Sequence, residues 1–388
     1  MNDEPKLPSL PESIADCKSY LDLSRYQLSL TNNYPEPHYL LNFQGVGFSA
    51  LGGIQAVSGQ KKNGKTWVMT QLMAAILNSE SERVQAFLPG LELNADTADY
   101  LGHEPTVLYV DTEMEKLNTA KVLRRVHWLC GWDMQQDNDR FRSLWLRNIT
   151  DIEDVKAWKQ RREIIYHAIE TYKPTAVFID GIRDIIGDFN NNEESAQLVT
   201  ELMAVATTND CCIWNVLHFN PRPGNDDESK MRGHLGTELG NKVTDTLVSS
   251  KKKDGSGRVI FTVKQLDARN KDMQDWHFEI TNDAGELGVP SMTNQAPIAE
   301  PKAVKADSPE DIRQWLHAGQ DDIQWPATGV EIKEIFKRYG NVKKNDKLQA
   351  DIQVAIAQKY IVPQPESERE HGQRMPKYYI NHDLICPF

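Results

Sequence analysis

The sequence has few cysteines, and no stretch of it is apolar enough to enter a membrane. None of the 388 residues lies in an apolar run of about 18, the length that a membrane-spanning helix needs. The first residues, MNDEP, lack the basic start and the apolar stretch of a secretory signal. The five cysteines show no C-x-x-C spacing, so we expect reduced thiols and no zinc site. Because neither an apolar span nor a secretory signal is found, we expect a cytoplasmic protein that does not contact membranes.

An excess of positive charge is missing as well. The chain has 44 Lys and Arg against 56 Asp and Glu, a formal net charge of -12. Basic and acidic residues balance from 301 to 388, so the whole acidic excess lies in the first 300 residues. This excludes a protein that binds nucleic acid through bulk positive charge, but it leaves room for local basic patches.

One short motif predicts a phosphate-binding loop. GQKKNGKT, Gly59 to Thr66, fits the pattern G-x-x-x-x-G-K-[ST] and stands between an apolar strand at 54–58 and a helix at 65–78. Successive backbone N–H groups in such a loop, followed by a helix N-terminus, bind phosphate. Lys65 would reach the β- and γ-phosphates of ATP, and Thr66 would hold Mg²⁺ through its hydroxyl. The residues predicted to contact the nucleotide are Gly59, Gln60, Lys61, Lys62, Asn63, Gly64, Lys65, Thr66 and Trp67.

Two other apolar runs end in acids that suit the chemistry of ATP. The run TAVFIDG (175–181) ends in Asp180, and we expect its strand to lie beside the strand that enters the phosphate loop. Asp180 would then orient Mg²⁺ through water. The run TVLYVDTEM (106–114) carries Glu113, which is placed to position and deprotonate the attacking water. Asp111 is the competing candidate for that catalytic role.

Strand-like and helix-like segments alternate from about 38 to 285, the pattern of a parallel sheet covered by helices. The predicted strands are 54–58, 106–111, 143–147, 176–180, 212–218, 246–250 and 259–265. The predicted helices are 65–78, 117–129, 154–172 and 194–208. The expected fold class is therefore α/β, with a mainly parallel sheet flanked by helices.

The order of these motifs resembles the RecA-like P-loop ATPase core, and more narrowly the branch of KaiC, DnaB and RepA-type hexameric helicases. The resemblance covers about 40–285. It implies that His218, in WNVLHFN, senses the γ-phosphate of ATP, and that the chain forms a homo-oligomer such as a hexameric ring. It also implies that Lys264 or Arg269, in VIFTVKQLDARNKD, reaches the γ-phosphate bound by a neighbouring subunit. These two cations are spaced more widely than in bacterial replicative helicases, so the choice between them stays open.

Two long polar segments follow the strands that end at Asp180 and His218. They cover 181–195 and 220–242 and are rich in Gly, Asn and Pro, which predicts functional loops. In RecA-like rings, loops at these places face the central channel and hold single-stranded DNA. The local candidates for phosphate contact are Arg183, Arg222, Lys230, Arg232 and His234, although Asp226, Asp227 and Glu228 dilute the second loop.

The pattern after the core predicts a small separate domain. The expected division is an N-terminal arm (1–37), the ATPase core (38–285), a linker (286–306) and a winged-helix α+β domain (307–388). Three helices followed by a hairpin with a long polar tip are typical of a winged helix, and a generic oligomerisation module is the alternative. The stretch 333–347 has a local net charge of about +4, the signature of a phosphate-tracking surface or of an ordinary solvated helix face. The predicted duplex contacts are Lys337, Arg338, Lys343, Lys344, Lys347 and, from the wing, Arg374.

Together these features predict a Mg·ATP-hydrolysing ATPase that acts on DNA. It resembles the RepA-like helicases of bacterial plasmids and mobile elements, so helicase, replication or mobilisation activity is expected. The alternative is an ATP-switched DNA-binding regulator or loader that does not unwind DNA. A KaiC-like signalling ATPase without DNA is a third hypothesis.

Overall fold

The chain was analysed as a computed structural model. It describes residues 23–25, 27–34, 36–219, 231–253, 257–268, 271–294, 296, 306–369 and 375–386. The chain divides into two compact units, Met1–Pro297 and Ile298–Phe388, which are treated separately below. Within the described residues, no helix has both the length and the apolar character needed to cross a bilayer.

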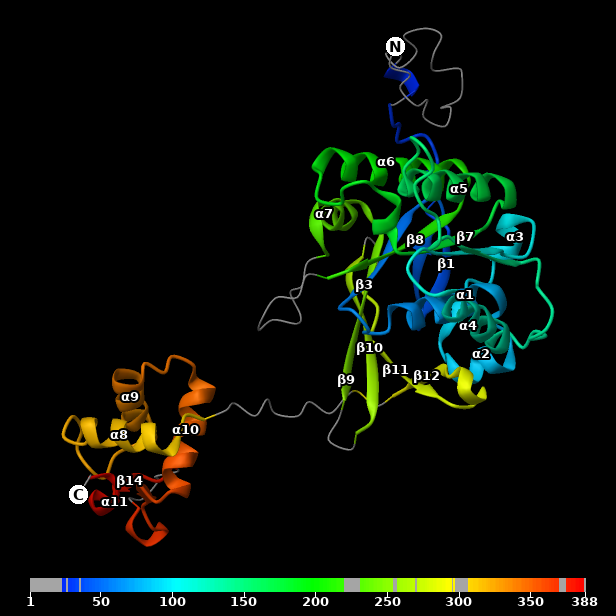
Figure 1. The fold of residues 1–388 in the computed structure, drawn as a ribbon. Helices are drawn as coiled ribbons and strands as arrows, with labels where there is room; N and C mark the ends of the chain where they lie inside the picture. Colours follow the sequence, from blue (N-terminus) through cyan, green and yellow to red (C-terminus); the bar gives the residue numbers. More distant parts are fainter. Residues whose placement is uncertain are drawn as a thin grey trace. The chain divides into compact units, whose positions relative to one another are not determined.

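A large mixed sheet forms the centre of the first unit (Figure 1). Six neighbouring strands, from β9 to β6, pair in parallel, and the remaining three extend the sheet beyond β9 with antiparallel pairing. Its nine strands within the described residues, in order across the sheet, are β12 (Val289–Thr293), β11 (Trp276–Thr281), β10 (Val259–Ala268), β9 (Asp245–Lys253), β3 (Ile54–Gly59), β8 (Cys212–His218), β7 (Ala176–Asp180), β5 (Val107–Asp111) and β6 (Phe141–Trp145). The sequence-predicted strands are all present.

The strand that ends in Asp180 does not lie beside the strand that enters the phosphate loop, so that expectation was wrong. Strand β8 lies between β3 and β7 and pairs with both in parallel. Its run CIWNVL is buried along its length, which suits a strand covered on both faces. Asp180 is therefore two strand spacings, about 10 Å, from the end of β3 at the backbone. Side chains must bridge this gap.

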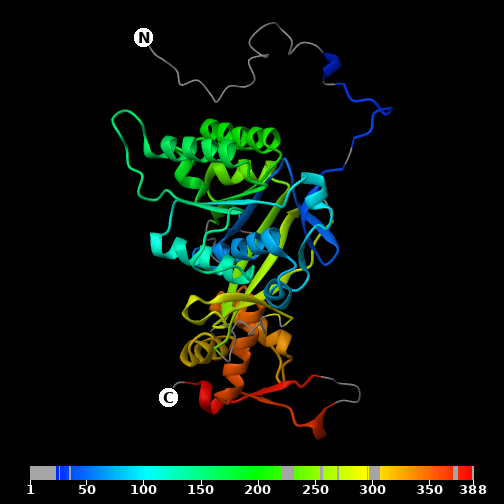
Figure 2. The same cartoon turned by 90° about the vertical axis from the view of Figure 1, so that its right-hand side faces the viewer.

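Helices cover both faces of the sheet, as Figure 2 shows from the side. Helices α1 (Lys65–Asn78), α2 (Glu82–Phe87) and α4 (Lys116–Leu129) pack on one face around a core that includes Val57, Tyr109 and Phe178. Helices α5 (Ala157–Tyr172), α6 (Asn192–Thr208) and α7 (Gly233–Lys242) cover the other face. Because residues on almost every side of α1 are buried, the helix after the phosphate loop is held between the sheet and its neighbours.

Several short elements were not predicted. A separate antiparallel sheet has the order β2 (Val46–Ala50), β1 (Tyr39–Phe43) and β4 (Leu91–Leu93), and α3 (Thr97–Leu101) follows it. Helix α7 occupies half of the segment 220–242 that was expected to be a loop. Its glycines serve close packing, since a Cβ on Gly236 would lie 2.4 Å from the backbone of Met231. Strand β12 lies inside the range 286–306 expected to be a linker, because it extends the antiparallel pairing of β11.

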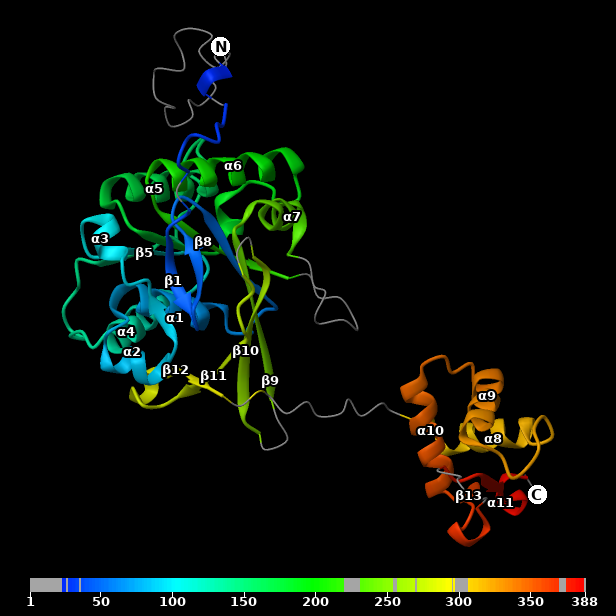
Figure 3. The same cartoon turned by 180° about the vertical axis from the view of Figure 1, so that it is seen from behind.

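Among its described residues, the second unit contains three longer helices, a short antiparallel strand pair and a short last helix. Figure 3 shows these elements. Helix α8 is capped by Ser308, whose side chain accepts a hydrogen bond from the backbone of Asp311. Helix α9 begins with a capping box between Thr328 and Glu331. The apolar core includes Ile312, Phe336 and Ile352. The elements are α8 (Pro309–Gly319), α9 (Gly329–Gly340), α10 (Asn345–Ala357), β13 (Ile361–Pro363), β14 (Tyr378–Ile380) and α11 (His382–Ile385).

Candidate functional site

Two glycines give the phosphate loop its shape. Gly59 ends β3 and Gly64 precedes α1, and both have positive φ angles, of 151° and 90°. A Cβ on Gly59 would lie 2.3 Å from the carbonyl oxygen of Ser249, and a Cβ on Gly64 would lie 2.6 Å from the ring of Phe261. Side chains at these positions would force the loop off its support, so the motif's glycines are required by sterics as well as by backbone conformation.

The antiparallel part of the sheet forms a floor under this loop. The Ser249 hydroxyl, on β9, donates a hydrogen bond to the carbonyl oxygen of Asn63, and the Phe261 ring, on β10, packs against Gly64. Phe261 is itself stacked on Phe278 with ring centroids 4.9 Å apart. The sequence motif gave no indication of these supports, because they come from strands nearly 200 residues later.

Lys65 is buried at the start of α1. Its ammonium group donates hydrogen bonds to the carbonyl oxygens of Gln60, at 2.8 Å, and Gly59, at 3.3 Å. Burial lowers the pKa of Lys65 to about 8, and the carboxylates of Asp180 and Glu113 partly oppose that effect. The side chain therefore curls over the loop at the place where a bound phosphate chain would lie.

Thr66 and Asp180 bridge the gap left by the intervening strand. The Thr66 hydroxyl donates to Oδ2 of Asp180 at 3.0 Å, and the Tyr109 hydroxyl donates to the same oxygen at 3.3 Å. Burial raises the pKa of Asp180 to about 7, with smaller contributions from Asp111 and Glu113. A hydroxyl and a carboxylate in contact beside a phosphate loop are the oxygen donors that Mg²⁺ prefers, so these residues fit the predicted cation.

The hydrogen bonds of Asp111 and Glu113 separate the two candidates for the water-activating acid. The Asp111 carboxylate accepts hydrogen bonds from the backbone N–H groups of Glu113 and Met114, at 2.9 and 2.8 Å, and from the Thr119 hydroxyl at 2.6 Å. Its oxygens are committed to holding the loop between β5 and α4. The geometry therefore favours Glu113 for the chemical role and gives Asp111 a structural one.

Glu113 faces His218. Oε2 of Glu113 lies 3.6 Å from Nε2 of His218, the last residue of β8, which is level with Gly59 across the β3–β8 pair. The contact with His218 lowers the pKa of Glu113, and the charges of Lys65 and Arg183 add to this effect while burial opposes it. Glu113 is thus held as a carboxylate, the form that can accept a proton.

The backbone around Glu113 is fixed from two sides. Gly181, directly after Asp180, has φ 105°, and a Cβ there would lie 2.2 Å from the Thr112 hydroxyl and 2.8 Å from Cγ of Glu113. On the other side, the indole of Trp145 donates to the carbonyl oxygen of Met114 at 3.0 Å. These contacts fix the backbone on both sides of Glu113, so the position of its side chain toward a substrate is fixed as well.

Arg183 and Arg232 meet at a single aromatic ring. Arg183 lies in a short 3-10 helix, Ile182–Ile185, and its guanidinium is 4.3 Å from the ring centroid of Phe189. Arg232 lies just before α7, with its guanidinium 5.4 Å from the same centroid. His234 is in the first turn of α7. The two segments predicted to contact DNA are thus joined through Phe189, while Arg222 and Lys230 lie outside the described residues.

The other predicted residues of the core, where the structure describes them, contact other parts of the first unit. Lys264, on β10, forms an ion pair with Asp275 at 3.7 Å, and Arg269 lies outside the described residues. Trp67 packs against the guanidinium of Arg125, 4.0 Å from its ring centroid. Arg125 also donates to the carbonyl oxygens of Leu287 and Gly288. Trp67 therefore supports the turn before β12 as well as lying next to the phosphate loop.

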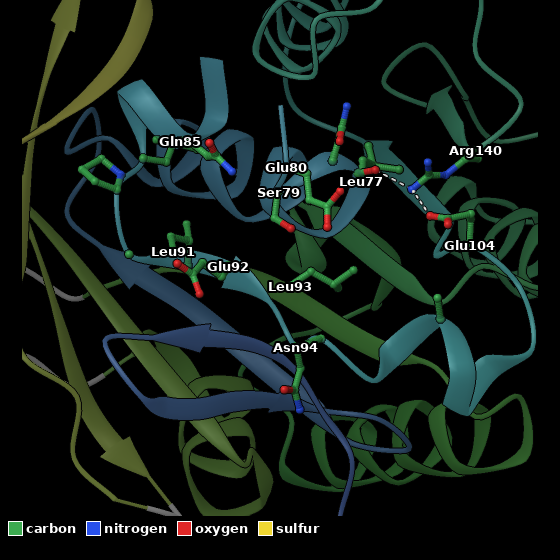
Figure 4. A pocket seen from close by; sticks show the side chains of 16 residues that line it. Leu77, Ser79, Glu80, Gln85, Leu91, Glu92, Leu93, Asn94, Glu104 and Arg140 are labelled. Atoms are coloured by element: carbon green, nitrogen blue, oxygen red, sulfur yellow. Dashed lines mark hydrogen bonds and ion pairs between the residues drawn. The ribbon is translucent and has the colours of Figure 1, made fainter. Parts of the chain in front are cut away.

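A pocket of about 510 Å³ lies at the opposite end of α1 from the phosphate loop (Figure 4). Its lining includes Leu77, Glu80 and Glu92, and Arg140 pairs with Glu104 at its rim at 3.3 Å. None of the sequence-predicted site residues lines it, so it is separate from the candidate nucleotide site.

The basic stretch of the second unit is largely paired. Lys337 contacts Glu334 at 2.6 Å, Arg338 contacts Asp322 at 3.0 Å, and Lys347 contacts Asp307 at 2.7 Å. Lys343 and Lys344 are exposed, and neither forms an ion pair with a side chain that the structure describes. Arg374 lies outside the described residues. Fewer of the basic residues predicted to contact DNA are therefore unpaired, among those that the structure describes, than the sequence suggests.

Comparison with known proteins supports the nucleotide site. Residues 35–222 match the family model described as an AAA domain, a range that holds Lys65, Glu113, Asp180 and His218. No curated protein matches the chain. Among solved structures, it is similar to a KaiC-like protein of the archaeon Pyrococcus horikoshii, with 13% identity and a TM-score of 0.42 over 66% of this chain and 99% of that one. At so low a TM-score, no conclusion follows from that likeness.

The family match and the observed geometry agree. The motif order expected for a RecA-like core is present, with the phosphate loop after β3 and the two acids at the ends of β5 and β7. The match over residues 35–222 and the phosphate loop both favour a nucleotide-hydrolysing ATPase core.

Proposed function

We propose that this protein is a Mg·ATP-hydrolysing ATPase that acts on DNA, of the RepA-like helicase type found on bacterial mobile elements. The observation that carries the ATPase part is the convergence of four side chains from three elements. Lys65 and Thr66 start α1, Glu113 follows β5, and Asp180 ends β7, with Thr66 and Asp180 in direct contact at 3.0 Å.

Each residue has a role that follows from its environment. Lys65 and the loop N–H groups bind the phosphates, and Thr66 and Asp180 hold the cation. When bound, Mg²⁺ neutralises charge that develops on the phosphates. Glu113 is ionised and held by His218, so it can orient a water molecule and accept its proton. His218 lies between this acid and the loop, a position suited to sensing whether the γ-phosphate is present.

The DNA part of the proposal rests on two basic surfaces. In the core, the Phe189 ring contacts both Arg183, which follows β7, and Arg232, which precedes α7. In the second unit, three helices followed by the β13–β14 pair fit a winged helix, with α10 as recognition helix and Lys343 and Lys344 at its start. Cations from two separate elements suit a phosphate backbone better than a small anion.

We further propose that the active form is a homo-oligomer, such as a hexameric ring, in which Lys264 or Arg269 acts on the nucleotide of a neighbouring subunit. An arginine or lysine supplied in this way stabilises charge that appears only in the transition state. Mixing Arg269→Ala subunits with Lys65→Ala subunits tests this arrangement, because some mixed interfaces would contain both intact residues. Recovery of turnover on mixing supports it, and additive loss contradicts it.

The deciding experiment measures ATP turnover and strand separation together. We expect ATPase activity that single-stranded DNA stimulates, and ATP-dependent displacement of a strand from a forked duplex. Glu113→Gln is the matched control, since it should bind ATP and DNA but displace no strand. Robust turnover that leaves the fork intact at every protein concentration would exclude the helicase and favour an ATP-switched DNA-binding regulator or loader.

A further inference from the structure

Tyr109 brings a phenol hydroxyl to the acid at the centre of the site. It lies in the middle of β5, fully buried on the sheet face that α1 covers. Its hydroxyl donates to Oδ2 of Asp180 at 3.3 Å, and the Thr66 hydroxyl donates to the same oxygen at 3.0 Å. Two hydroxyls from different elements therefore converge on one carboxylate oxygen.

Packing alone does not require a tyrosine at this position. The neighbours of Tyr109 on the same face include Val107 and Phe178, so a phenylalanine ring would fill the space equally well. The hydroxyl has to be satisfied in an apolar interior, and Asp180 satisfies it. A phenol is protonated at neutral pH, so the hydroxyl of Tyr109 is a donor to Asp180.

We propose that Tyr109 is a positioning residue for Asp180: it holds the carboxylate toward Thr66, so that the oxygen pair for Mg²⁺ exists before the nucleotide arrives. This inference rests on the proposed function, because it assumes that Mg·ATP binds at the phosphate loop. Tyr109 lies on the strand next to that of Asp180, two residues before the position that pairs with Asp180. Thr66, by contrast, is itself a cation ligand in the proposal. The hydrogen bond from β5 is therefore the one that can persist unchanged when the cation binds.

The test compares two conservative variants. Tyr109→Phe removes only the hydroxyl. Tyr166→Phe is the matched control, because Tyr166 is another buried tyrosine with a carboxylate partner, Glu201 at 3.2 Å, on the opposite face of the sheet. Binding of a fluorescent, non-hydrolysable ATP analogue is measured against Mg²⁺ concentration and, separately, in EDTA. Melting temperature is measured for each protein.

We expect Tyr109→Phe to raise the half-saturating Mg²⁺ concentration about tenfold, the effect of losing one hydrogen bond to a charged acceptor. Its affinity for the analogue in EDTA should match that of the wild type, and Tyr166→Phe should change neither value. A role confined to folding would lower the melting temperature and leave the Mg²⁺ requirement unchanged.

The outcomes separate this inference from the function on which it depends. If the wild-type protein fails to bind the analogue, the proposed function falls and the inference falls with it. If the wild type binds and Tyr109→Phe keeps the wild-type Mg²⁺ requirement, the inference alone is overturned. Equal losses of affinity with and without Mg²⁺ also overturn it, because they would indicate a general disturbance of the loop.

Discussion

The two units use charged residues in opposite ways. In the first unit, Lys65 and Asp180 are buried, and Lys65 donates to carbonyl oxygens of its own loop. Asp180 contacts Thr66 and Glu113 contacts His218, each of them a residue from a distant part of the chain. In the second unit, Lys337 and Arg338 lie at the surface and pair with nearby acids. Burying charge is costly, so a buried cluster of ionisable groups indicates a functional site, whereas exposed pairs contribute little.

The proposed ATPase activity and the proposed DNA binding therefore rest on different kinds of observation. The ATPase half depends on tertiary contacts that bring distant residues together. The DNA half depends on the number of cations on a surface, and half of those named in the second unit are already neutralised by neighbours. Changes in the buried cluster should therefore abolish function, whereas changes at the surface should have graded effects.

Replacing Lys65 should have the largest effect. Lys65→Ala is expected to reduce ATP turnover by about 10³-fold or more, because the group that meets the developing phosphate charge is lost. Because the folded-state pKa of Lys65, about 8, lies below its ordinary value of 10.5, the charged form is penalised in the folded protein. The apo variant should therefore melt no lower than wild type at pH 7, and any gain should shrink as pH rises from 8 toward 10.5. Lys116→Ala, at an exposed position outside the phosphate loop, should retain turnover.

Replacing Glu113 should separate binding from hydrolysis. Glu113→Gln is expected to lower the turnover number by about 10²–10³-fold while nucleotide affinity stays within a few-fold of wild type, since only the proton acceptor is removed. Single-turnover hydrolysis and analogue binding measure the two quantities. Glu115→Gln is the control, as Glu115 is a neighbouring, more exposed acid. Normal turnover in Glu113→Gln would return the catalytic role to Asp111.

Replacing Asp111 should mainly affect stability. Asp111→Asn keeps one oxygen, which can still accept from the N–H groups of Glu113 and Met114, but it places an NH2 group against the Thr119 hydroxyl, which then loses its acceptor. We expect the free energy of unfolding to fall by about 2–4 kcal/mol, measured by urea denaturation. Glu113→Gln should fall by less than 1 kcal/mol in the same assay. Similar values for both would contradict the division of roles between these acids.

Changes in the second unit should produce the smallest effects. Lys343→Ala with Lys344→Ala should weaken DNA binding several-fold and reduce the slope of log affinity against log salt by about 1 for each lysine removed. Lys337→Ala with Arg338→Ala should change the slope less, because those cations are already paired. Binding is measured by fluorescence anisotropy from 50 to about 300 mM salt. If the paired residues matter as much, the ion pairs open on binding and the contrast between the units weakens.

Local sequence was enough to predict the strands of the main sheet and the phosphate loop. The predicted strands are short and mainly apolar runs, and Gly59 and Gly64 stand in a motif that becomes specific through the strand before it and the helix after it. The order of the strands across the sheet could not be predicted, because nothing in the run TAVFIDG indicates that β8 lies between its strand and β3. Helix α7 was missed because GHLGTELGNK has the composition of a loop, although Leu235 and Leu239 are buried and Gly236 allows close contact.

The residues that would bind the nucleotide and the cation could be predicted from the sequence, whereas the residues that hold them in place could not. Lys65, Thr66 and Asp180 follow from motifs, and the structure brings them together. The choice between Asp111 and Glu113 required hydrogen bonds, because two acids two residues apart look equivalent in sequence. Tyr109 and Ser249 could not be found from a pattern, since each acts through a contact made by the folded sheet.

The floor beneath the phosphate loop also has a mechanical consequence. Strands β9 to β12 are joined edge to edge by backbone hydrogen bonds, and β12 is the last strand before the chain continues to the second unit. We expect tension applied to the chain after Thr293 to act first on these backbone hydrogen bonds and then on β9, where Ser249 donates to the carbonyl oxygen of Asn63. A continuous set of hydrogen bonds thus links the edge strand β12 to the phosphate loop.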